Sequence, residues 1–101
     1  MESNTHQAAA SRILQDLGIA DVSPDWNGCD PVWPVFEKMA NEGATVVVKI
    51  DGERSPPADT GRYTVVVSGG PLKDDFFRTD TAVLEEGLAR AILHYAERCW
   101  K

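Results

Sequence analysis

Two runs of three consecutive valines, Val46–Val48 and Val65–Val67, place the strongest limit on what this chain can fold into. β-Branched residues favour strands, and successive side chains of a strand point to opposite faces of its sheet. A strand with valine on both faces needs apolar cover on both, whereas a strand wet on one face alternates apolar with polar residues. The runs therefore predict either a small sheet between helices or a sheet whose second face is closed by another chain.

The valine runs lie in two predicted strands, over residues 44–51 and 62–68. Alternation along the first strand places one set of side chains on each face of the sheet. The connection 52–61 is polar, contains a Pro-Pro pair and is longer than a tight hairpin requires, so we expect it to project from the body. The two faces of the first strand are Val46, Val48 and Ile50 on one side, and Thr45, Val47 and Lys49 on the other.

Helical spacing of apolar residues appears in three places. The segment 7–17 predicts a short helix that Gly18 ends as a left-handed cap, and the segment after Asp30-Pro31 predicts a second helix. Phe76–Phe77 suggests a short third strand. The apolar stripe of the second helix is predicted to comprise Trp33, Phe36, Met39 and Ala40. The stripe of the last helix comprises Leu84, Leu88, Ala91, Ile92, Tyr95 and Cys99.

These elements predict an α+β fold. It has a small antiparallel sheet of two long strands and a short third, with helices packed on its faces in the order α-α-β-β-(β)-α. The chain has 101 residues, of which 43% are hydrophobic, which is ordinary for one globular domain and too high for a disordered segment. We therefore expect a single domain over residues 1–101, in which the helix at 7–17 is added to a core over 31–100.

The acidic balance of the chain limits the partners that it can take. Sixteen acidic residues stand against ten basic ones, and the formal net charge is −6 at pH 7. A field of this sign repels phosphate backbones and attracts basic proteins, and the commonest basic proteins are those that hold nucleic acid. The charge predicts a basic protein partner and no direct contact with nucleic acid. Ordinary solubility is the other reading of the same acidity.

The sequence also predicts where the protein works. The valine runs are the longest strongly apolar stretches, far short of the ~20 residues that a membrane span needs, so no membrane association is expected. The first twelve residues lack the basic and apolar segments of a secretory signal. Cys29 and Cys99 stand far apart and outside any metal or redox spacing, so we expect two free thiols in a cytoplasmic protein.

The residues that carry chemistry in enzymes are sparse in this chain. His6 and His94 are the only histidines that could act as a general base, and Cys99 lies five residues after His94. Five helical residues turn two side chains about 140° apart, which argues against a Cys–His pair on one helix. The loop aspartates match no calcium loop. We therefore expect no enzyme activity, no catalytic residue, no metal site and no cofactor.

Three stretches of the chain resemble the phage ABA sandwich domain, a family of small proteins encoded by phages and prophages. These stretches are PDWNGCDPVWPVFEKMANEG, YTVVVSGG and TAVLEEGLARAILHYAE, which together span roughly residues 24–98. The shared features are packing motifs, and the family has no established activity and no catalytic residues to carry over. The resemblance implies a phage or prophage accessory gene that acts in the bacterial cytoplasm; the helix at 7–17 departs from the pattern.

The function hypothesis that follows is a small binding protein. In this hypothesis its acidic surface occupies the basic nucleic-acid channel of a bacterial defence complex, as an anti-CRISPR-type antagonist does. Large aromatic residues dominate interface energetics, and Trp100 beside the C-terminus is either the last part of the core or an oligomer contact. The candidate partner-binding residues are Asp51, Glu53, Asp59, Asp74, Asp75, Glu85, Glu86 and Trp100.

Two alternatives remain open at this point. The first is a structural or assembly role, with a homodimer or larger oligomer formed through the valine-rich sheet or Trp100. The second is a binder of small ligands such as nucleotides. That role requires the basic side chains to converge on one pocket, because the net charge otherwise repels phosphate. The basic side chains concerned are Arg54, Arg62, Lys73 and Arg78.

Overall fold

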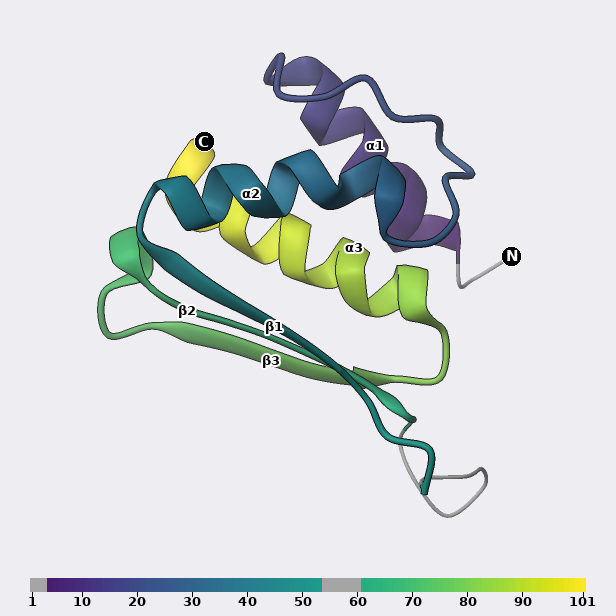
Figure 1. Cartoon of the computed structure of the whole chain (residues 1–101). Helices are drawn as coiled ribbons and strands as arrows, with labels where there is room; N and C mark the ends of the chain where they lie inside the picture. The colour runs from purple at the N-terminus through teal and green to yellow at the C-terminus, as the bar shows by residue number, and fades with distance from the viewer. Residues whose placement is uncertain (1–3, 54–60) are drawn as a thin grey trace.

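A three-stranded antiparallel sheet carries the helices of this chain on one of its faces (Figure 1). The structure is a computed structural model, and it describes residues 4–53 and 61–101. The strands are β1 (Ala44–Ile50), β2 (Tyr63–Gly69) and β3 (Phe76–Thr81), in the spatial order β1-β2-β3. The predicted α+β class is confirmed, and the short third strand is longer than its two phenylalanines suggested.

Three α-helices accompany the sheet, in the order that the sequence predicts. Gly18 ends the first helix at φ +71°, and its N–H donates to the carbonyl of Gln15, which is the left-handed end expected of a glycine there. The α-helices are α1 (Asn4–Asp16), α2 (Trp33–Asn41) and α3 (Leu84–Tyr95), and the short turns are η1 (Asp30–Val32), η2 (Gly70–Leu72) and the π-helical η3 (Ala96–Trp100).

The register of the sheet gives each strand an inner face toward the helices and an outer face away from them. Val46 of β1 pairs with Val67 of β2, and Val48 pairs with Val65. Val65 and Val67 are fully buried, whereas Val47, on the opposite face of β1, is exposed. The predicted division of β1 into two faces agrees with this register.

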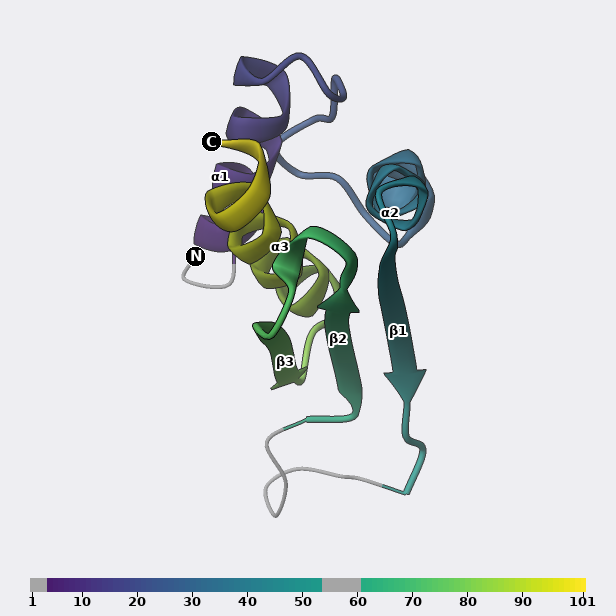
Figure 2. The same cartoon turned by 90° about the vertical axis from the view of Figure 1, so that its left-hand side faces the viewer.

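The helices form two layers on the inner side of the sheet. α2 packs against β1 and α3 packs against β2 and β3, while α1 lies on the far side of α3 from the sheet (Figure 2). The expectation that helices cover both faces is wrong, because α1 buries its apolar stripe against α3 instead of the second face. That outer face is mainly polar and comprises Thr45, Val47, Lys49, Thr64, Val66, Ser68, Phe76, Arg78 and Asp80.

The buried stripe of α2 differs from the predicted one by a small rotation of the helix. Trp33 and Ala40 were assigned to this stripe, and both are exposed. α2 covers the edge strand β1, so one flank of the helix faces solvent and only the other flank enters the core. The α2 side chains that are buried, together with the preceding residue, are Val32, Val35, Phe36 and Met39.

The irregular connection between α1 and α2 is held to the body by Trp26, as its place in the sequence suggests. Its indole is buried and donates from Nε1 to the carbonyl of Gln7 at 3.0 Å, and the Gln7 amide donates back to the carbonyl of Trp26. Two reciprocal bonds satisfy buried polar groups that would otherwise be costly. The connection between α1 and α2 is therefore fixed to α1.

Candidate functional site

The acidic residues that the sequence nominates beside the hairpin follow directly after β1. Asp51 lies 3.8 Å from the ammonium of Lys49, and its Oδ1 accepts the backbone N–H of Glu53 at 3.0 Å. The Glu53 side chain is exposed. The third nominated residue of this group, Asp59, lies outside the described residues.

Asp74 and Asp75 lie at the opposite end of the sheet, between η2 and β3. Asp75 contacts Nε2 of His94 at 3.0 Å and Nε of Arg98 at 3.6 Å, both from the C-terminal part of the last helical segment. The hydrogen bond with His94, followed by the charge of Arg98, holds the pKa of the Asp75 carboxyl below its usual value. Asp74 is exposed beside it.

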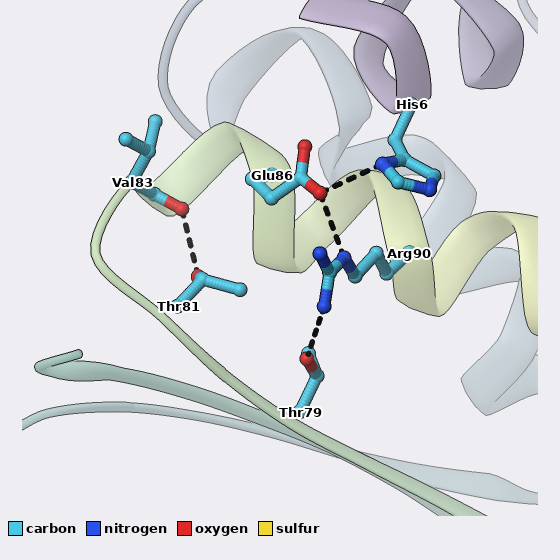
Figure 3. A network of polar contacts seen from close by, with 6 residues as sticks. All are labelled: His6, Thr79, Thr81, Val83, Glu86 and Arg90. Atoms are coloured by element: carbon cyan, nitrogen blue, oxygen red, sulfur yellow. Dashed lines mark hydrogen bonds and ion pairs between the residues drawn. The ribbon is translucent and has the colours of Figure 1, made fainter. Parts of the chain in front are cut away.

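Glu85 and Glu86 belong to the first turn of α3 and are engaged within the chain. Glu85 accepts the backbone N–H of Gly28 at 2.7 Å, which ties the α1–α2 connection to α3. Glu86 is buried and lies 2.7 Å from both Nδ1 of His6 and Nε of Arg90 (Figure 3). The Arg90 guanidinium reaches on to the Thr79 hydroxyl at 3.5 Å. This network joins α1, α3 and β3.

The nominated acids therefore do not form one surface. Their nearness along the sequence predicts Asp74, Asp75, Glu85 and Glu86 together around the start of the last helix. In the structure Asp74 and Asp75 adjoin the end of α3, and only Glu85 and Glu86 lie at its beginning. Asp75, Glu85 and Glu86 are also bonded within the chain, and Glu86 is buried. Most of their partners come from other elements, so spacing along the sequence could not show these bonds. The exception is the Glu86–Arg90 pair, whose spacing of four residues is a local helical signal.

Trp100 takes the first of the two roles that the sequence left open for it. Its ring packs edge-on against Tyr95 at 4.9 Å between centroids, and Nε1 donates to the Glu42 carboxylate at 3.1 Å. The Tyr95 hydroxyl donates to the same carboxylate at 2.7 Å. Trp100 is half-buried and fixes the end of the chain to the end of α2.

Cys29 and Cys99 are the two cysteines of the chain, and burial limits the reactivity of their thiols. Cys29 and Cys99 are free and half-buried, and burial is the main cause that raises the pKa of each thiol. A raised pKa lowers the thiolate fraction and with it the reactivity. Among residues 4–53 and 61–101, no three His, Cys, Asp or Glu side chains gather as metal ligands, and no helix is long and apolar enough to span a bilayer.

The exposed apolar side chains point to a different surface. Four of them lie on β1 and at the start of α2, where no further strand of the described residues pairs with β1. We call this region the β1 surface. It comprises Trp33, Val46, Val48 and Ile50 on the inner side of the edge and Val47 on its outer side. The exposed fractions are 57% for Trp33, 47% for Val47, 39% for Val48 and 62% for Ile50.

A groove of about 360 Å³ lies between α2 and β1 within this surface. Its apolar walls come from both elements and from Leu88 of α3, and its polar lining includes the exposed carboxylate of Glu37. A concave and mainly apolar lining with few polar side chains is typical of ligand-binding sites. The lining residues are Cys29, Trp33, Phe36, Glu37, Ala40, Val46, Val48 and Leu88.

Acidic side chains lie at the wall of the groove that contains Cys29. Asp30 is the next residue in the chain, and Glu85 accepts the N–H of Gly28, the residue before Cys29. Burial first, and then the charges of these two carboxylates, raise the pKa of the Cys29 thiol. Glu37 stands in the lining itself, and Asp51 follows the end of β1. We call Asp30, Glu37 and Glu85 the acidic rim of the β1 surface.

The sequence does not predict this site, because helical spacing places Trp33 on the buried stripe of its helix. One signal in the sequence could have indicated that Trp33 is exposed. Prolines lie on both sides of it, and they delay the regular helix so that Trp33 is the first residue of α2. An unassigned tryptophan at a helix start is a better interface candidate than one in the middle of a stripe.

Comparison of the chain with protein-family models, with curated proteins and with solved structures found no match. The resemblance to the phage ABA sandwich domain therefore stays a prediction that rests on the three stretches of sequence described above.

Proposed function

We propose that this chain acts by binding a basic protein and that the β1 surface is the contact site. The observation that carries the proposal is the coincidence of three features in one place. These are an open strand edge, a cluster of exposed apolar side chains headed by Trp33, and an acidic rim beside an apolar groove. Interfaces concentrate their binding energy in such apolar centres, and charge at the rim selects the partner.

The biological form of this proposal is the antagonist hypothesis. Its support is the net charge of −6, which favours a partner whose own surface is basic, such as a nucleic-acid-handling protein of a bacterial defence complex. The contact surface differs from the one first nominated, because the nominated acids lie at opposite ends of the sheet and Glu86 is buried. In this form of the hypothesis, apolar contacts at the β1 surface supply the affinity, and the acidic rim attracts and orients the basic partner.

Photo-crosslinking tests where the partner binds. A photoreactive residue replaces Val47 in one variant and Val83 in the other, because these two valines are exposed to similar extents, 47% and 44%. In a bacterial host that carries such defence complexes, we expect one basic protein to crosslink through position 47 and not through position 83. Equal crosslinking at both positions, or none at position 47, contradicts the proposal.

Charge reversal tests the acidic rim against the acids nominated first. Glu37→Lys and Asp74→Lys make the same change in net charge at two exposed sites, one in the groove lining and one at the far end of the sheet. We expect Glu37→Lys to weaken capture of the crosslinked partner several-fold, most strongly at low salt, and Asp74→Lys to leave it nearly unchanged. If Asp74→Lys weakens capture more than Glu37→Lys does, the acids nominated from the sequence form the contact surface and the β1 surface does not.

The nucleotide-binding alternative gains no support from the described residues. Arg62 adjoins the start of β2 and Lys73 follows η2 beyond its other end, so these two side chains are separated by the length of the strand. Arg78 lies between them on the outer face, 3.5 Å from Asp80. Arg54 lies outside the described residues.

A further inference from the structure

The hydrogen bonds between β1 and β2 decide which backbone groups of β1 face its open edge. The N–H of Asp51 donates to the carbonyl of Arg62 at 2.8 Å, in the same register as the rest of the pair. Directly opposed residues of an antiparallel pair exchange both bonds at every second position. Thr45, Val47 and Lys49 therefore bond to β2. The residues whose N–H and C=O face the open edge are Ala44, Val46, Val48 and Ile50.

These edge-facing residues also provide the inner side of the β1 surface. Val46 and Val48 line the groove beneath α2, and Ile50 is exposed beyond them. An extended segment laid along β1 would thus find free backbone donors and acceptors and an apolar groove for every second side chain at the same positions. This combination is what strand addition to a sheet edge requires.

β3, the other edge of the sheet, lacks this combination. Its outer side chains include Arg78 and Asp80, which lie 3.5 Å apart, and Arg90 of α3 reaches its inner residue Thr79. Charged side chains on an edge strand discourage pairing with another chain. β1 has no proline and a single charged side chain, that of Lys49, which points to the outer face. The open edge at β1 is therefore the receptive one.

The acidic rim indicates what occupies the edge. Glu37 lines the groove, and Asp30 and Glu85 adjoin its wall at Cys29, so an incoming segment with lysine or arginine between its apolar residues meets opposite charge. A second copy of this chain is the competing occupant. Antiparallel pairing centred on Val47 places Ile50 against Ala44, but it brings two acidic rims together in a chain of net charge −6.

We infer that the partner donates an extended segment that pairs with β1 as a fourth strand. Its apolar residues alternate with lysine or arginine, and the apolar ones enter the groove between α2 and β1. This inference rests on the proposed function and specifies how the partner binds. It needs no rearrangement of the sheet, because the edge-facing groups of β1 have no strand partner among the described residues.

A random library of displayed twelve-residue peptides tests the chemistry of the occupant. Selection on the wild-type chain is expected to enrich peptides in which apolar residues alternate with lysine or arginine. Val48→Pro removes one edge-facing N–H and leaves the bonds to β2, since proline is tolerated where the N–H of an edge strand faces outward. We expect this variant to lose about tenfold in affinity or more, and Val48→Ala, which keeps the N–H, to lose less.

Amide hydrogen exchange supplies a readout that needs no variant. In the free chain the amides of Val46, Val48 and Ile50 exchange quickly, while those of Val47 and Lys49 are protected by β2. A selected peptide is expected to protect the first three. Peptides that bind without this alternating protection overturn strand addition, as does a selection that enriches acidic or non-alternating sequences.

The outcomes separate the inference from the proposed function. Protection of Val46, Val48 and Ile50 in the free chain that rises with protein concentration identifies a second copy as the occupant and overturns the inference. A partner that crosslinks through position 47 as strongly in a Val48→Pro background as in the wild-type chain overturns strand addition and leaves the proposed function in place. Peptides that add to β1 while no basic protein crosslinks there reject the proposed function alone.

Discussion

At the residue scale, Glu42 joins two distant parts of the chain, although the sequence did not nominate it. Its carboxylate accepts the Tyr95 hydroxyl and the Trp100 indole, and it lies 3.2 Å from the Lys38 ammonium. Burial alone raises the pKa of this carboxyl, but the three donors outweigh it and hold the pKa below its usual value. One carboxylate thereby fixes the end of α2 to the end of the chain.

The lowered pKa of Glu42 predicts that its contribution depends on pH. Because the carboxyl is more acidic in the folded state than in the unfolded state, its stabilisation is present above the unfolded pKa, about 4.3, and is lost as pH falls through the folded value. We expect Glu42→Gln to lower the free energy of unfolding by about 1 kcal/mol at pH 7. Urea unfolding at pH 7 and pH 3 checks this, and an equal effect at both values contradicts it.

At the element scale, the close approach of α3 to the sheet depends on Gly87, which has no side chain. A Cβ on Gly87 would lie 2.8 Å from Oγ1 of Thr81 and 3.2 Å from Cγ2 of Val65, and all three residues are buried. Glycine costs an exposed helix about 1 kcal/mol relative to alanine, so its presence in α3 reflects packing. α3 therefore lies nearer to β2 and β3 than a helix with a side chain there permits.

Gly87→Ala is expected to destabilise the fold by about 1–2 kcal/mol although alanine favours helices, because overpacking outweighs the helical gain. Gly52→Ala is the matched control, since a Cβ at that turn position meets nothing within 4 Å. Thermal unfolding of the two variants compares them. Stabilisation by Gly87→Ala would show that α3 can move away from the sheet at little cost.

The strands and helices were predictable from the sequence because valine runs and helical spacing are local signals. Which strand forms the edge was not, since the two valine runs are identical in sequence. Val65 and Val67 are fully buried in the central strand, whereas Val47 and Val48 are exposed at the edge. The candidate site could not be predicted either, because the β1 surface forms only where α2 packs beside an edge strand, and the sequence does not show which strand is the edge. Of the two bases beside Glu86, Arg90 lies four residues along the same helix and was predictable, whereas His6 comes from α1 and was not.

At the scale of the whole molecule, the layers make the sheet one-sided. Val65 and Val66 are neighbours in β2, but Val65 points into the helical layer and is fully buried, while Val66 points to the outer face. The sequence favoured cover on both faces, either by helices or by another chain. The helices cover one face, and a substitution can test whether another chain covers the second.

Val65→Thr and Val66→Thr make the same change of one methyl group to a hydroxyl. We expect Val65→Thr to cost about 1–3 kcal/mol, because it buries a polar group in the core, and Val66→Thr to change stability by less than about 0.5 kcal/mol. Urea unfolding at several protein concentrations measures both. A large effect of Val66→Thr that depends on concentration would show that a second chain closes the outer face.

The open edge of β1 also has a consequence for the lifetime of the chain in a cell. The segment TVVVKI is rich in β-branched residues, has no proline and carries one charge, which is the composition of segments that stack into fibrils. A molecule without its partner presents this segment as a template to every other such molecule. Partner binding would then protect the chain from aggregation, and molecules made in excess of their partner would be the first to be lost.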